Sequence, residues 1–102
     1  MISRFEIWLA EVSFSEIEGY KDRPILILNH IKKEVLCLRM TSKAPQTTGD
    51  FEVTKWKEAG LQKPTVVNTT IRLKLNEDKL IKRIGVLHND DVLLLKIRHH
   101  II

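Results

Sequence analysis

The sequence has only one cysteine and no long apolar run. These two features argue against a disulfide-stabilised protein and against a membrane-spanning one. Cys37 cannot form a disulfide within the chain and suits a reducing compartment, so we expect a cytoplasmic protein. Apolar runs such as residues 25–28 and 92–95 are far too short to cross a bilayer. No long apolar stretch follows Met1–Glu6, so we expect neither a signal peptide nor a membrane partner.

Several signatures of catalysis and metal binding are also missing. The chain has no glycine-rich phosphate loop, no nucleophile elbow and no pair of catalytic carboxylates. Its four histidines lie in turns or at the chain end, without the spacing of a metal site. Asp90–Asp91 is better explained as a helix start. We therefore predict no metal and no cofactor.

The composition is that of one ordinary globular domain spanning residues 1–102. The chain is 43% hydrophobic and 29% charged, and it shows no repeat, low-complexity tract or linker. Lysine and arginine number 17 against 13 acidic residues, a formal charge of +4. This mild excess permits a nucleic-acid partner without demanding one.

Hydrophobic patterning and turn residues predict five or six short strands followed by one helix. Glycine, proline and polar clusters separate the segments. Such a series suggests a small, strongly bent sheet or a partly open barrel. The predicted strands are Arg4–Val12, Pro24–Asn29, Glu34–Thr41, Phe51–Val53, Thr65–Leu75 and Leu80–Leu87, with a helical turn at Thr54–Ala59, a turn or brief helix at Asn76–Lys79, and a terminal helix capped by Asn89 or Asp90 and running to about Arg98.

The entry to the second predicted strand carries the most suggestive side chain. Pro24 fixes its own φ and pushes Arg23 toward an extended conformation, after a loop that contains Glu18 and Gly19. A guanidinium held there is always charged and donates in a planar fork, which suits a phosphate. The same arginine could equally form an ordinary surface ion pair.

Two further groups of polar residues have two interpretations each. Thr41–Ser42 ends the third strand, where adjacent hydroxyls either donate to a phosphate oxygen or cap a turn. In the strand Thr65–Leu75, strict alternation puts a polar row on one face. That row either follows a phosphodiester backbone or is the solvated outer face of a half-buried sheet. Its members are Val66, Asn68, Thr70, Arg72 and Lys74.

Taken in order, several segments resemble the PemK/MazF family of toxins from bacterial toxin–antitoxin pairs. Glu6–Leu9 is similar to the family's opening strand, and Glu18 followed after four residues by Arg23–Ile27 resembles its E-x-x-x-x-R-P-hydrophobic motif. Further similar segments are Thr41–Ser42, Phe51–Val53, Ile71–Arg72 and Lys82–Leu87. The resemblance implies an SH3-like barrel of the CcdB/PemK type, with five to seven short strands and a terminal helix.

The resemblance also implies an activity and partners. The family forms homodimers, is neutralised by a cognate antitoxin, and cleaves single-stranded RNA at short motifs without metal. The ribose 2′-hydroxyl attacks the neighbouring phosphate, which needs charge stabilisation, a proton acceptor and a proton donor. From the residues themselves, we expect an apolar dimer patch near the terminal helix, because its leucines, valine and isoleucine exceed what one helical face can hide.

Carried over by position, the resemblance assigns roles to particular residues. Arg23 would contact the scissile phosphate or protonate the leaving group, and Glu18 would accept a proton or orient Arg23. Thr41 and Ser42 would hydrogen-bond the phosphate. RNA would be bound by the polar row of the fifth strand, through Asn68, Thr70, Arg72 and Lys74.

One segment departs from the family pattern. Some members carry an acidic–basic pair just before the position of Ile71, where this chain has Val67–Thr70. Either Glu18 takes the role of the missing acid, or activity is reduced or lost. The sequence therefore leaves open a non-catalytic nucleic-acid or protein-binding module of the same fold, including a CcdB-like gyrase poison, and a generic small β domain.

Overall fold

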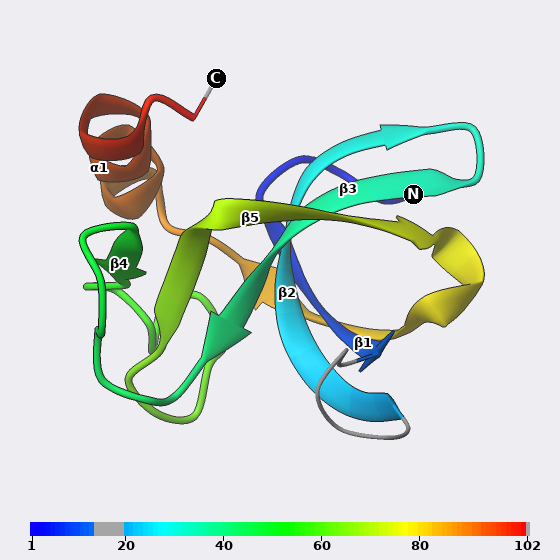
Figure 1. The fold of residues 1–102 in the computed structure, drawn as a ribbon, viewed down its shortest axis with the longest axis horizontal. Helices are drawn as coiled ribbons and strands as arrows, with labels where there is room; N and C mark the ends of the chain where they lie inside the picture. The colour runs from blue at the N-terminus through cyan, green and yellow to red at the C-terminus, as the bar shows by residue number, and fades with distance from the viewer. Residues whose placement is uncertain (14–19, 102) are drawn as a thin grey trace.

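The computed structural model describes residues 1–13 and 20–101, which form six strands, one short 3₁₀ helix and one α-helix (Figure 1). None of the helices in this part of the chain is long and apolar enough to span a membrane. The strands are β1 Glu6–Ser13, β2 Tyr20–Ile31, β3 Glu34–Thr41, β4 Asp50–Glu52, β5 Val66–Asn76 and β6 Leu80–Val86, and the helices are η1 Glu77–Lys79 and α1 Asn89–His99.

The six strands form one antiparallel sheet in the order β4-β5-β3-β2-β1-β6. β5 and β6 lie on opposite sides of the β3-β2-β1 ribbon, yet only the three residues of η1 separate them along the chain. The sheet therefore has to curl until β5 and β6 meet at η1, which Figure 1 shows. This confirms the predicted mainly β fold, an SH3-like barrel with a C-terminal helix.

β2 is a central strand, and its apolar run is buried on both faces, as the sequence predicts. Ile25 and Ile27 pack into a cluster of buried residues from β1, β2 and β3, which we call the barrel core, and partly buried residues of β5 and β6 pack against it. Leu26 and Leu28 pack on the other face into a larger cluster beneath β4 and α1, which we call the helix-side core. The barrel core is Ala10, Val12, Ile25, Ile27, Val35 and Cys37, and the helix-side core is Ile7, Leu26, Leu28, Leu38, Met40, Phe51, Val53, Ala59, Val67, Leu87, Leu95 and Ile101.

The first hairpin is longer than the sequence suggests. β2 begins at Tyr20 and pairs with β1 as far as Ser13, so Arg23 lies inside the strand and not at its entrance. The ladder continues through polar residues because backbone hydrogen bonds do not require apolar side chains. The tight turn after β2 is also shorter than predicted, with only Lys32 and Lys33 outside the strands.

The predicted cap of α1 is one or two residues late, whereas the predicted turn at Thr54–Ala59 does contain the hydrogen bond of a single helical turn, from Ala59 N to the Lys55 carbonyl at 3.1 Å. The helix cap is His88, whose Nδ1 accepts the N–H of Asp90 at 3.1 Å. Residues 54–60 form a run of turns that ends at Gly60, whose φ of +94° favours glycine. A Cβ at Gly85 would collide with the carbonyl oxygen of Ala59, so this glycine allows the turns to pack against β6.

Asp91 connects these turns to α1. Its carboxylate is fully buried and accepts three hydrogen bonds: from Thr54 N at 2.9 Å, Thr54 Oγ1 at 2.7 Å and Lys55 N at 2.8 Å. Thr54 therefore does not cap a helix but donates to one that lies 37 residues later in the chain. An acidic residue predicted only to favour a helix start also fixes the segment that carries Trp56.

β5 contains a bulge that breaks its side-chain alternation. Met40 of β3 pairs with Val67, whereas Leu38 pairs with Arg72, so residues 68–71 oppose Arg39 alone. Within the bulge, Thr69 N and Thr69 Oγ1 both donate to the Gly49 carbonyl, at 2.9 and 2.6 Å. Strict period-2 alternation therefore does not hold along β5, and the single polar row predicted from it does not form.

Candidate functional site

The structure places Arg23 on the barrel side of β2. It pairs with Ala10 of β1 and is partly buried. Because side chains alternate along a strand, Arg23 shares the face of Ile25 and Ile27, which line the barrel core. The β2–β3 ladder ends at the pair Ile25–Arg39, so the end of β2 that carries Arg23 diverges from β3 (Figure 1).

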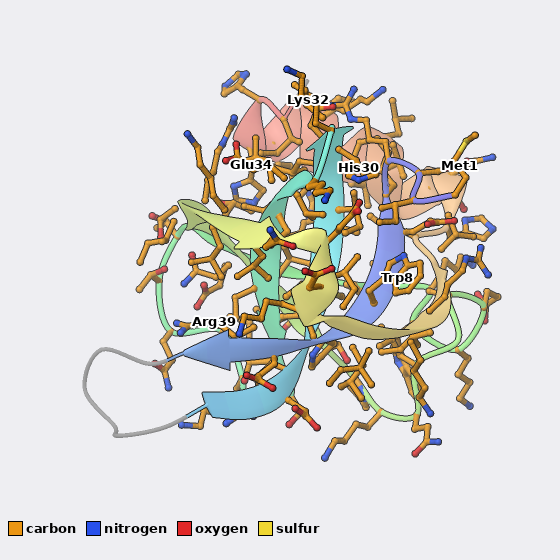
Figure 2. The ribbon with its side chains drawn as sticks, turned by 90° about the vertical axis from the view of Figure 1, so that its right-hand side faces the viewer. Met1, Trp8, His30, Lys32, Glu34 and Arg39 are labelled. Atoms are coloured by element: carbon orange, nitrogen blue, oxygen red, sulfur yellow. The ribbon has the colours of Figure 1, made fainter. Side chains whose placement is uncertain are left out.

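A second arginine, Arg39, belongs to the same face. It pairs with Ile25 and is partly buried, two residues from Cys37 of the barrel core on one side and from Thr41 on the other. Figure 2 labels Arg39, which in that view is drawn above the arrowhead of β1. The alternation of β3 predicts this orientation, and the signal that marks the residue is a lone arginine in an otherwise apolar strand. Sequence reasoning did not include it in the site.

Thr41 ends β3 on the same face as Arg39. Its Oγ1 accepts the N–H of Lys43 at 3.2 Å, so it does cap the following turn. A hydroxyl that accepts still has its own hydrogen to donate, and the capping role is therefore compatible with a phosphate contact. Thr41 lies two residues beyond Arg39, past the last β2–β3 pair.

Ser42 is exposed and lies at the rim of a hollow of about 400 Å³. Trp56 contributes an aromatic ring, and Pro45 and Pro64 contribute rigid apolar walls. The ammonium group of Lys57 lies 5.3 Å from the Trp56 ring centroid. The hollow is lined by Ser42, Lys43, Ala44, Pro45, Glu52, Val53, Thr54, Trp56, Pro64, Thr65 and Val66.

The bulge of β5 separates the remaining predicted binding residues into two groups. Val66 pairs with Thr41, and Asn68, two residues on, is the first residue of the bulge, at the end nearer to Thr41, and pairs with Asp50 of β4. Asn68 Oδ1 accepts from both Thr70 N at 3.0 Å and Thr70 Oγ1 at 2.7 Å, so these two side chains are engaged with each other.

Arg72 and Lys74 lie on the opposite face. Arg72 pairs with Leu38 and Lys74 with Leu36, both of which belong to or pack against the helix-side core. The prediction that these two cations share a face with Asn68 and Thr70 is therefore wrong, because the bulge shifts the alternation. Arg23, Arg39 and Thr41 are brought to one face, and Glu18 lies outside the described residues.

In the described part of the chain, two titratable groups have clear shifts, and neither suggests catalysis. Burial raises the pKa of Cys37 to about 12, so its thiol is inert and serves as a small core residue. Burial raises the pKa of Glu6. Hydrogen bonds from Ser3, Trp8 and Arg83, together with the charge of Arg83, lower it by more, so the pKa lies below its ordinary value. Among residues 1–13 and 20–101, no three His, Cys, Asp or Glu side chains form a group that could hold a metal ion.

Comparisons with known proteins agree with this architecture. A Mycobacterium tuberculosis toxin, MazF-mt6, has a TM-score of 0.70 at 19% identity, over 95% of this chain and 98% of its own. A mycobacterial endoribonuclease in complex with its cognate antitoxin has a TM-score of 0.76 at 16% identity, over 96% and 90%. At these identities the likeness shows the fold alone. No curated protein matches the chain by sequence.

The family model is decisive where the individual relatives are distant. The model of the PemK-like, MazF-like toxin of type II toxin–antitoxin systems matches residues 3–100, nearly the whole chain. The described segments that carry the resemblance in the sequence lie on, or at the ends of, the six strands β1 to β6, in chain order. The chain belongs to the PemK-like, MazF-like family of toxins of type II toxin–antitoxin systems.

Proposed function

We propose that this protein is a metal-independent endoribonuclease toxin that acts on single-stranded RNA in the cytoplasm. One observation carries the proposal: the guanidinium-bearing residues Arg23 and Arg39 and the hydroxyl of Thr41 share one face of neighbouring strands in a chain of this family. Two cations and a hydroxyl donor are suited to a phosphoryl group that gains negative charge during reaction.

The proposed reaction is an internal transfer of the phosphoryl group. The ribose 2′-oxygen forms a bond to phosphorus, the bond from phosphorus to the 5′-oxygen breaks, and a 2′,3′-cyclic phosphate and a 5′-hydroxyl result. Glu18 accepts the proton of the 2′-hydroxyl, and water supplies the proton that the leaving 5′-oxygen takes up. Arginine keeps its proton in proteins, so we assign Arg23 to charge stabilisation rather than proton donation. Arg39 adds a second positive charge, and Thr41 and Ser42 donate to phosphate oxygens.

The hollow beside Ser42 supports the choice of RNA as substrate. Its position next to the end of β3 suits a nucleobase flanking the scissile phosphate, with Trp56 as a stacking partner. Base–aromatic stacking of this kind contributes about 1–3 kcal/mol per base. Asn68 extends the polar surface on the same side of the bulge.

The test is a cleavage assay in EDTA with chemically defined ends. Purified protein is incubated with single-stranded RNA, with DNA of the same sequence, and with RNA that carries a single 2′-deoxy substitution at the mapped cut. We expect cleavage of the RNA only, with a 2′,3′-cyclic phosphate and a 5′-hydroxyl. Cleavage at the deoxy-substituted position would rule out the 2′-hydroxyl as nucleophile, and a need for metal would contradict the metal-independent mechanism.

We further propose a homodimer assembled through α1 and a cognate antitoxin as partner. Leu93 and Ile97 are 58% and 63% exposed and lie four residues apart on one face of the helix, whereas Leu95 points into the helix-side core. A similar structure is an endoribonuclease held by its antitoxin. The formal charge of +4 favours an acidic antitoxin segment.

A second candidate is a non-catalytic module of the same fold, including a gyrase poison. The segment Val67–Thr70 favours it, because the acid–base pair of some relatives is replaced by residues that hydrogen-bond within the bulge. Salt-sensitive RNA binding with intact RNA after long incubation would identify a binding module. Arrest of DNA supercoiling with intact transcripts would identify a gyrase poison.

A further inference from the structure

Arg72 belongs to a hollow of its own, on the face of the sheet opposite to Arg23 and Thr41. The hollow measures about 320 Å³ and lies between the N-terminal segment, β2, β3, β5 and the residues that follow α1. Leu28 and Ile101, which are buried, and the partly buried Leu36 form its apolar floor. The polar groups on its rim are Arg4, Asn29, Arg72 and His100. We call it the rear hollow.

The charged side chains that line the rear hollow are of one sign. Arg4 and Arg72 bring two permanent positive charges, and His100 adds a third when it is protonated. Lys96 lies nearby, because its Nζ is 5.7 Å from the centroid of the Phe5 ring that Arg4 Cζ approaches to 4.6 Å. Among residues 1–13 and 20–101, those that line the hollow include no acid. Like charges gathered in this way attract an anion.

The end of α1 opposes an anion only weakly. The C-terminus of a helix carries about half a negative charge. Basic residues of the last turn, Lys96, Arg98 and His99, already offset it. The two full guanidinium charges on the rim outweigh the negative charge that remains at the helix end. The apolar floor strengthens their attraction for an anion because it keeps water away from one side.

The donors identify the kind of anion. Arg4, Asn29, Arg72 and His100 line the hollow from four different segments of the chain. Asn29 Oδ1 accepts the N–H of His30 at 2.9 Å, which leaves the amide NH₂ of Asn29 to donate. A carboxylate offers two oxygens, whereas a phosphate group offers a tetrahedral set that meets donors from several sides.

We propose that the rear hollow is a phosphate-binding site, separate from the reaction centre and built on Arg4 and Arg72. The phosphate comes either from the backbone of bound RNA or from a small free phosphate. The RNA source rests on the proposed function, whereas phosphate binding itself does not depend on RNA cleavage.

The first experiment uses inorganic phosphate as probe and NMR as readout. Phosphate is titrated into the protein at constant ionic strength set with chloride, and backbone amide shifts around Arg72 and His100 are followed. We expect saturable shifts. Arg4→Ala and Arg72→Ala should each raise the dissociation constant for phosphate about tenfold or more, because each variant loses a charged hydrogen-bond partner. Lys82→Ala is the matched control, since Lys82 is an exposed cation on β6 and does not line the rear hollow. Unfolding midpoints of the variants verify that each one is folded.

The second experiment separates the two sources of phosphate. Binding of a 2′-deoxy-substituted RNA that cannot be cut is measured against salt concentration. If the phosphate belongs to the RNA backbone, Arg72→Ala weakens RNA binding. It also reduces the slope of the logarithm of the binding constant against the logarithm of salt concentration by about 0.7, the value for one phosphate on a single strand. For the free-phosphate source, RNA binding is unchanged and only the phosphate response is lost. No phosphate-dependent shifts in the folded protein, shifts equally strong in the Arg72→Ala variant, or a stronger response to acetate than to phosphate would overturn the proposal.

Discussion

Replacing Asp91 should lower the free energy of unfolding more than replacing the other acidic residue of α1. Its carboxylate accepts three hydrogen bonds from Thr54 and Lys55, and the side chain is fully buried. Asp91→Ala leaves three donors without their acceptor, each at a cost of about 1–3 kcal/mol. Water reaches these donors in part, since Thr54 is exposed and Lys55 half-buried. The lower figure therefore applies, and the free energy of unfolding should fall by about 3 kcal/mol.

The matched control is Asp90→Ala, in the same helical turn. Asp90 is exposed, and its contribution through the helix dipole and the 3.7 Å contact with His88 should be about 0.5 kcal/mol. For a domain of this size about 4 °C of Tm corresponds to 1 kcal/mol, so thermal unfolding should show a fall of roughly 12 °C for Asp91→Ala and roughly 2 °C for Asp90→Ala. Equal falls for the two variants would refute the role of Asp91 as the connection between α1 and the turns at residues 54–60.

Three other predictions concern the site, the N-terminus of β1 and the helix surface. Arg39→Ala should lower the cleavage rate by about tenfold or more while the unfolding midpoint stays close to wild type, and an unchanged rate would remove Arg39 from the site. Glu6 has a lowered pKa in the folded state, so its charged form stabilises the fold at pH values above its ordinary pKa of 4.5. This contribution is lost as the pH falls through the lower pKa of the folded state. Glu6→Gln should therefore be less stable at neutral pH, and the difference should shrink in urea titrations at acid pH; a constant difference would contradict the shift. Leu93→Asp combined with Ile97→Asp should convert a dimer to a monomer in analytical ultracentrifugation with the circular dichroism of the fold retained, and a dimer that persists would place the interface elsewhere.

Local patterns in the sequence predict much of this fold. β3 has the bounds and the two faces that alternation indicates, with Leu38 in one core and Cys37 in the other. The unbroken apolar run of β2 predicts burial on both faces, which the structure confirms. These features depend on residues close together in the chain, where side-chain period alone decides which face is buried.

The parts that sequence reasoning missed depend on contacts between distant residues. The bulge in β5 is held by Gly49, some 20 residues earlier, and no period-2 pattern reveals it. The bulge moves Arg72 to the opposite face of the sheet from Thr41. The sequence-based assignment, which carried the family's binding residues over one by one, had placed all of them on one surface. Asp91 is a second example, because its partners lie 36 and 37 residues away and the sequence around it indicates only a helix start.

The central claim is that Arg23 stabilises charge on the phosphate that is cut. Single-turnover cleavage of RNA in EDTA by Arg23→Ala, compared with wild type and with Arg98→Ala on the exposed end of α1, tests it most directly. The account predicts that Arg23→Ala cleaves about 10² to 10³ times more slowly while RNA with an uncleavable 2′-deoxy site still binds, and that Arg98→Ala keeps the wild-type rate. Full cleavage by a folded Arg23→Ala variant would contradict it.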